Sequence, residues 1–118
     1  MLLINVLNIT VFLSSMQKDT LDKKLDENVY ELWNPSALIQ TYMSAFTFWK
    51  YDNNQYYADK METIIQVLSR KDFQFQSEFM ILMCARRDAC AAEELYDEAA
   101  DVRDAINYTA SQLDFSEK

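Results

Sequence analysis

Residues 77–113 read SEFMILMCARRDACAAEELYDEAADVRDAINYTASQL, without a glycine or a proline. The two strongest helix breakers are missing from this stretch, which predicts helix throughout. Steps of three and four residues, typical of helices packed near-antiparallel, connect Ala99, Val102, Ile106, Thr109 and Leu113. Small side chains at Ala99 and Ala100 would let two helices approach closely. Nothing in Glu93-Glu94-Leu95 breaks a helix, so a hairpin and one continuous helix over 77–113 both remain open.

Composition extends the helical prediction to the whole chain. Its 118 residues include no glycine, where average usage of about 7% would give roughly eight, and Pro35 is the only proline. Tight β-hairpins and bulges depend on residues that tolerate positive φ, which glycine supplies most easily. We therefore expect an all-α fold, a small bundle of four to five helices that ends in an antiparallel helical hairpin.

Turn signals divide the chain before residue 77. Residues 17–33 predict an amphipathic helix with a narrow apolar stripe at Leu21, Leu25, Val29 and Leu32 (or Trp33). Asn34-Pro35 predicts a capped helix start. The helix that follows carries apolar residues on two faces, which is typical of a helix that is central in its bundle or shared with another chain. Residues 51–54 predict a turn and 55–70 the next helix, whereas 73–76, FQFQ, are interpreted as a linker whose rings fill the bundle.

The first sixteen residues form a separate apolar segment. Residues 1–13 are too short to span a bilayer as a helix, and no basic residue precedes Lys18, as a signal peptide would require. Secretion is therefore not expected. Either Met16 is the biological start or this segment adds an element to the core. Residues 17–118 are expected to form a single helical domain.

Charge and residue types exclude most catalytic classes. The chain has no histidine, the commonest general base and zinc ligand, and no glycine for phosphate-binding loops. We expect neither an enzyme nor a cofactor. The net charge of −8 opposes direct nucleic-acid binding and suits a basic protein partner or solubility alone. Cys84 and Cys90 lie about 120° apart around a helix, so reduced, buried thiols and a cytoplasmic location are predicted.

The segment 90–106, CAAEELYDEAADVRDAI, resembles the UVR motif, a helical hairpin of excision-repair helicase and nuclease subunits and of Clp-type ATPases and their adaptors. The resemblance covers about residues 80–113. It implies no chemistry but docking on a second hairpin of the same type or on a partner protein. The matching positions, and thus the expected partner-binding residues, are Tyr96, Ala99, Ala100, Arg103, Asp104 and Ile106. Leu95 departs from the pattern, because that turn position is commonly polar.

Two other groups of residues are candidate contacts. Acidic residues at Glu93, Glu94, Asp97 and Asp101 form a candidate docking face; with Glu98 and Asp104 they are expected to be a solvated acidic surface, not a metal site. Aromatic residues around the turn at 51–54 form a candidate exposed contact, comprising Trp49, Tyr51, Tyr56 and Tyr57.

These observations predict a protein–protein interaction module, either an adaptor or a self-assembling protein, that docks through its acidic C-terminal hairpin. A homo-oligomer is compatible with this prediction, and no membrane association is expected. Two alternatives stay open. The chain is an acidic, DNA-mimicking inhibitor of a nucleic-acid enzyme, with a phage as a candidate source, or it is a small subunit of a larger assembly such as a virion.

Overall fold

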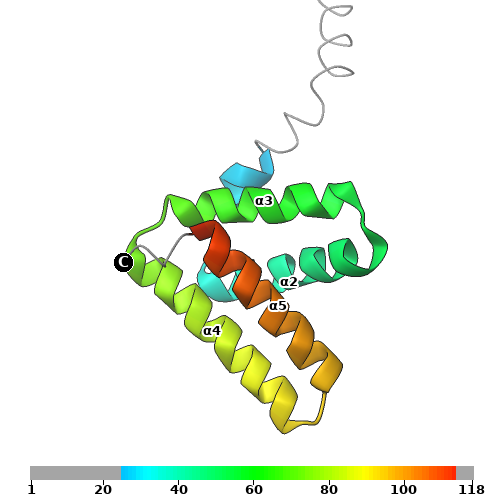
Figure 1. The fold of residues 1–118 in the computed structure, drawn as a ribbon. Coiled ribbons are helices and arrows are strands. Elements are labelled where there is room, and N and C mark those ends of the chain that lie inside the picture. The colour runs from blue at the N-terminus through cyan, green and yellow to red at the C-terminus, as the bar shows by residue number, and fades with distance from the viewer. Residues whose placement is uncertain (1–24, 114–118) are drawn as a thin grey trace, which may run out of the picture.

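The computed structural model describes residues 25–113, and every regular element in that range is a helix (Figure 1). Helical residues 25–30 precede four complete helices: α2 (Pro35–Asp52), α3 (Gln55–Ser69), α4 (Phe73–Ala92) and α5 (Tyr96–Leu113). The predicted all-α bundle is confirmed. The predictions for residues 1–16, including a start at Met16, and for 17–24, including Leu21, lie outside the described residues.

Asparagines cap the helices at positions that glycine or serine often occupies in other proteins. The Asn34 side chain accepts the Ala37 N–H at 2.9 Å, and Pro35 is the first residue of α2. Asn53 ends α2 in the left-handed region (φ 52°), which asparagine tolerates better than most residues. Asn54 then caps α3 by accepting the Tyr56 N–H at 2.9 Å. The predicted turn is confirmed but shorter, because α2 continues through Asp52.

The interpretation of residues 73–76 as a linker is wrong. They form the first turn of α4, because the Asp72 side chain accepts the Phe75 N–H at 2.9 Å and so caps the helix four residues earlier than expected. Phe73 is 61% exposed and does not fill the bundle, whereas Phe75 packs against the core. Gln76 is buried, and its amide donates to the Leu68 carbonyl at 2.8 Å, which satisfies the end of α3.

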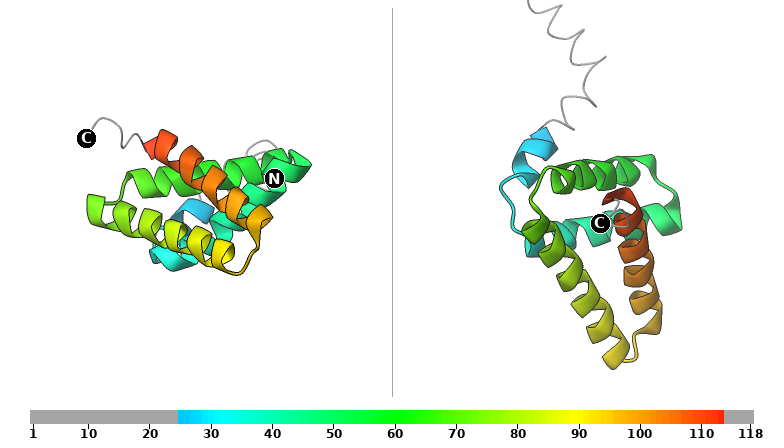
Figure 2. Two further views of the ribbon diagram at one scale, coloured as in Figure 1. Left: turned by 60° about the horizontal axis from the view of Figure 1, so that its bottom comes forward. Right: turned by 60° about the vertical axis from the view of Figure 1, so that its left-hand side comes forward.

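Two helical hairpins make the fold, α2–α3 and α4–α5 (Figures 1 and 2). Each of the four complete helices contacts the other three, so these contacts do not single out α2 as the central helix. The interior is apolar, with the Tyr42 and Phe79 rings in edge-to-face contact at 5.8 Å between centroids. Fully buried side chains of this core include Leu38, Tyr42, Met61, Ile64, Val67, Leu68, Phe79 and Met83.

Residues 25–33 attach to the bundle differently from the prediction. Most of the expected apolar stripe faces solvent: Leu25, Val29 and Leu32 are exposed, the last to 86%. The alternative last member, Trp33, is half-buried and packs against the core. Tyr30 is buried instead, in contact with the Trp33 ring at 5.1 Å. Ion pairs add to the attachment. Arg70 binds Glu27 and Glu31, each at 2.7 Å, Lys71 binds Glu31 at 3.1 Å, and Lys60 binds Asp26 at 3.3 Å.

Candidate functional site

The turn between α4 and α5 settles the choice between a hairpin and a continuous helix. Glu94 adopts a left-handed conformation (φ 63°). The Leu95 N–H donates to the Cys90 carbonyl at 2.9 Å and the Glu94 N–H to the Ala91 carbonyl at 3.0 Å, the two bonds of a Schellman motif. The Leu95 carbonyl accepts the Ala99 N–H at 2.9 Å and starts α5. The predicted hairpin is confirmed.

The inner face of α5 follows the predicted steps of three and four residues from Ala99 to Leu113. Val102 and Thr109 are buried, and Ala99, Ile106 and Leu113 are half-buried. Ala105 is also fully buried, a position that the predicted pattern omitted although it lies three residues after Val102. Thr109 reaches across the core: its Oγ1 hydrogen-bonds the Tyr42 hydroxyl at 2.7 Å and the Ala105 carbonyl at 2.7 Å.

The six positions of the resemblance divide by exposure. Tyr96 is 66% exposed and Arg103 is exposed, with its Nη2 3.2 Å from Asp104. Ala99, Ala100 and Ile106 are half-buried, and Ile106 packs against the core. Tyr96 and Arg103 are therefore the most exposed of the six positions.

Asp101 and Asp104 bind α2. The Lys50 ammonium lies 2.6 Å from Asp101 and 2.9 Å from Asp104, and the Tyr51 hydroxyl donates to Asp101 at 2.8 Å. The hydrogen bond from Lys50, with a smaller effect of Arg103, lowers the pKa of Asp104. The hydrogen bond to Asp101 raises the pKa of Tyr51. We call Lys50, Tyr51, Asp101 and Asp104 the α2–α5 clamp, which joins residues predicted for two separate surfaces.

The aromatic residues near residues 51–54 do not form one exposed patch. Trp49 is half-buried between Phe46 and Tyr108, with both centroid distances 5.8 Å. Tyr57 is half-buried and stacks on Phe48 at 4.7 Å. Tyr51 and Tyr56 are exposed, but Tyr51 belongs to the clamp. Whether these rings contact a partner remains a prediction.

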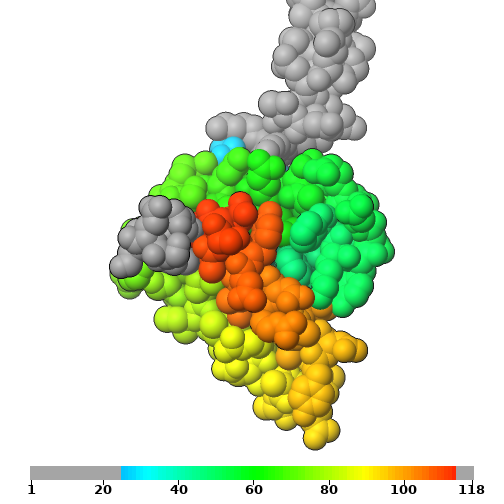
Figure 3. Space-filling model, viewed as in Figure 1, coloured from blue at the N-terminus to red at the C-terminus, as the bar shows by residue number. Residues whose placement is uncertain are grey.

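The hairpin tip, residues 91–97, is exposed at every position. It lies away from α2 and α3 in both Figure 1 and the right-hand view of Figure 2, and it forms the projection at the bottom of Figure 3. Leu95 and Tyr96 are its large apolar side chains, 41% and 66% exposed. Glu93, Glu94 and Asp97 surround them in sequence, and the tip contains no lysine or arginine.

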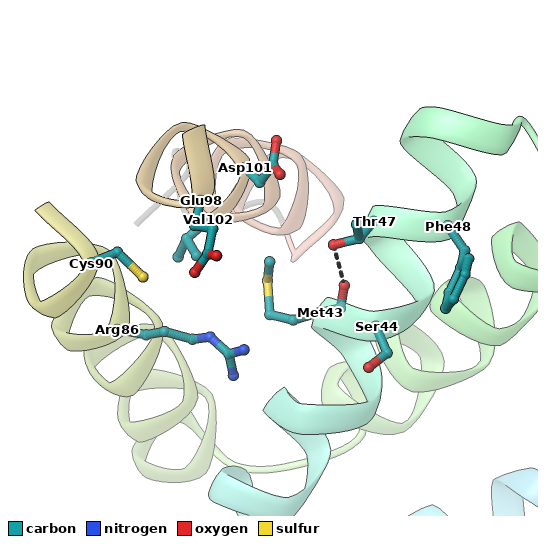
Figure 4. A pocket seen from close by; sticks show the side chains of 9 residues that line it. All are labelled: Met43, Ser44, Thr47, Phe48, Arg86, Cys90, Glu98, Asp101 and Val102. Carbon is teal, nitrogen blue, oxygen red and sulfur yellow. Dashed lines mark hydrogen bonds between the residues drawn. The ribbon is translucent and has the colours of Figure 1, made fainter. Parts of the chain in front are cut away.

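A cleft lies at the base of the hairpin, where α2, α4 and α5 meet (Figure 4). Its volume is about 340 Å³. Figure 4 shows Arg86 of α4 and Glu98 of α5 pointing into it from two sides, with Met43 of α2 beside them. The remaining lining residues are Ser44, Thr47, Phe48, Cys90, Asp101 and Val102. Sequence reasoning did not single out Arg86, because an arginine in an amphipathic helix carries no signal of what lies opposite.

The cysteines are free and only half-buried, so the prediction of buried thiols is wrong in degree. Cys90 lines the cleft. In residues 25–113 no three cysteine or acidic side chains gather closely enough to hold a metal ion. No helix in the same range has the length and apolar character needed to cross a membrane.

Comparisons with known proteins identify no relative. A scan against protein-family models finds no match, and searches of the curated proteins and of the solved structures find no significant similarity.

Proposed function

We propose that this chain is a non-enzymatic protein-interaction module that binds a basic protein surface through its hairpin tip. The observation that carries the proposal is the exposed pair Leu95 and Tyr96 on a projecting turn with three carboxylates around it. Tyrosine and other large apolar side chains are common interface anchors when a polar rim surrounds them. The carboxylates favour a partner of opposite charge and speed its approach.

The resemblance to the UVR motif supports the same proposal. Hairpins of that family dock on a second hairpin or on another protein, and Tyr96 and Arg103 are the matched positions that solvent reaches. Tip-to-tip association of two copies is disfavoured, because it would bring like charges together. We therefore place an adaptor role ahead of self-assembly. The free thiols of Cys84 and Cys90 fit the cytoplasmic location that forms part of the proposal.

The DNA-mimic alternative has less support. A decoy of the DNA surface needs carboxylates that stay available to a basic groove. Asp101 and Asp104 are bound by Lys50, which leaves three carboxylates on the tip beside two apolar side chains.

A role as a subunit of a larger assembly, such as a virion, is the second candidate. One observation favours it: Phe73 and Ile81 of α4 are each more than 60% exposed and line a shallow apolar groove with Ser77 and Met80. Burial in an assembly would remove this surface from water. Sedimentation of the purified protein tests it, because a monomer that stays monodisperse at high concentration and melts cooperatively would count against this role.

The main test compares variants in affinity purification from the native host, followed by mass spectrometry. Leu95→Ala/Tyr96→Ala is expected to reduce the captured partner at least tenfold, while the helical circular dichroism stays unchanged. Leu32→Ala is the matched control, since Leu32 is 86% exposed but lies far along the chain from the tip. Equal capture by all three proteins would contradict a role for the tip. Capture should also weaken as salt rises.

A further inference from the structure

Arg86 is the one cation without a carboxylate partner in the described part of the chain. Residues 25–113 contain seven lysines and arginines. Ion pairs occupy six of them, namely Lys50, Lys60, Arg70, Lys71, Arg87 and Arg103. In a protein with an excess of carboxylates, a half-buried guanidinium left unpaired inside a cleft is an exception.

The opposite side of the same cleft carries a free carboxylate. Glu98 points into the space between α4 and α5 and forms no ion pair or hydrogen bond with any residue in 25–113 (Figure 4). The other acidic residue of the lining, Asp101, is neutralised by Lys50. The cleft therefore presents one positive and one negative group that do not bind each other.

The rest of the lining combines apolar side chains with hydroxyl groups. Met43, Phe48 and Val102 supply the apolar surface. The Thr47 hydroxyl donates to the Met43 carbonyl at 2.9 Å, drawn as a dashed line in Figure 4, so its lone pairs can still accept a hydrogen bond. The volume of about 340 Å³ is at the lower end of the range for ligand sites.

We propose that this cleft binds a small zwitterion with an apolar group, the chemistry of a free apolar amino acid. The guanidinium of Arg86 binds the ligand carboxylate, for which its two parallel N–H donors are suited. Glu98 binds the ligand ammonium, and the apolar group lies on Met43 and Val102. This inference goes beyond the proposed function and does not depend on it, since the tip residues Leu95 and Tyr96 do not line the cleft.

The test titrates the full chain with L-alanine, L-leucine, L-methionine and L-phenylalanine and follows amide chemical shifts by NMR. At least one of the three larger amino acids is expected to shift amides of residues 43–48, 86–90 and 98–102 and to bind more tightly than L-alanine. For the best ligand, the N-acetyl derivative lacks the ammonium and the amide derivative lacks the carboxylate. Each is expected to bind at least tenfold more weakly.

Two variant pairs assign the charges. Arg86→Gln is expected to weaken binding at least tenfold, whereas Arg87→Gln, which breaks an ion pair with Asp88 outside the cleft, should leave it unchanged. Glu98→Gln should weaken binding and reduce the preference for the free amine over its N-acetyl form, with Asp97→Asn as control. If none of the four amino acids shifts these amides at millimolar concentration, or if Arg86→Gln binds as well as wild type, the proposal is overturned. Loss of partner capture by the tip variant has no bearing on either result.

Discussion

Tyr42 and Thr109 connect α2 to α5 inside the core through a hydrogen bond of 2.7 Å between their hydroxyl groups. Both side chains are fully buried, and burial raises the pKa of Tyr42, with a smaller opposing effect of Thr109. A buried hydroxyl that loses its partner keeps the cost of leaving water. At the scale of single residues, this polar contact is therefore the one most sensitive to a nearly isosteric change.

We expect Thr109→Val to lower the free energy of unfolding by about 1–3 kcal/mol, because the Tyr42 hydroxyl loses its partner in the core. Urea denaturation measures the change. Thr63→Val is the matched control: Thr63 is as deeply buried, but its hydroxyl donates only to the Asp59 carbonyl in its own helix, at 2.9 Å. A loss as large in the control as in Thr109→Val would mean that the contact between helices adds nothing.

At the scale of elements, the α4–α5 turn is the most unusual feature. Its left-handed residue is Glu94, where most helices with a Schellman motif have glycine. A side chain with a Cβ costs roughly 1–2 kcal/mol in that conformation. The turn nevertheless forms, because its two hydrogen bonds satisfy carbonyls at the end of α4 and because Val102, Ala105 and Thr109 hold α5 on the core.

Glu94→Gly is expected to raise the free energy of unfolding by about 0.5–1 kcal/mol, since relief of the left-handed strain exceeds the added freedom of the unfolded chain. Thermal denaturation at fixed pH provides the measurement. Glu93→Gly serves as control and should destabilise the protein, because Glu93 has a negative φ (−92°) and gains only unfolded-state entropy. The opposite order of the two variants would contradict the assigned turn geometry.

At the scale of the whole molecule, the clamp and the core join the two hairpins. Lys50 and Asp101 are 51 residues apart in sequence. The hydrogen bond from Lys50 lowers the pKa of Asp104 below its ordinary value of 3.8. The unfolded chain therefore binds more protons than the native protein between these two pKa values, and stability rises with pH there. The contribution of Asp104 is complete above about pH 4 and is lost as the pH falls through its lowered native pKa.

Lys50→Met should therefore reduce the loss of stability that wild type shows at acidic pH. We expect the drop in the urea midpoint between pH 5 and pH 2 to be smaller in this variant than in wild type, because the pKa of Asp104 returns toward its ordinary value. Arg87→Gln removes the same charge outside the clamp and should retain the wild-type profile. Identical profiles for all three proteins would show that the clamp is not formed in solution.

Local signals were sufficient for part of this architecture. Asn34-Pro35 and the asparagines at 53 and 54 predict helix ends correctly, because a cap depends on atoms within four residues of it. The interpretation of residues 73–76 as a linker is wrong, because two phenylalanines at alternate positions suit both a linker and a helix start. The cap formed by Asp72 decides between the two. For residues 25–32 the predicted helical spacing is correct, but the predicted buried face is wrong. Ion pairs to Lys60 and Arg70 orient that segment.

By itself, the sequence determined that this protein is a helical bundle without the histidine and glycine that most active sites require. It also determined most of the residues of α5 that face inward, although not Ala105, since a three–four spacing is kept in any helix packing. Only the tertiary structure decided that the chain turns at Glu94 and that Asp101 and Asp104 form ion pairs with Lys50. It also decided that Arg86 and Glu98 line one cleft. Each of these depends on groups brought together across distant segments, and helical periodicity specifies faces but not which faces meet.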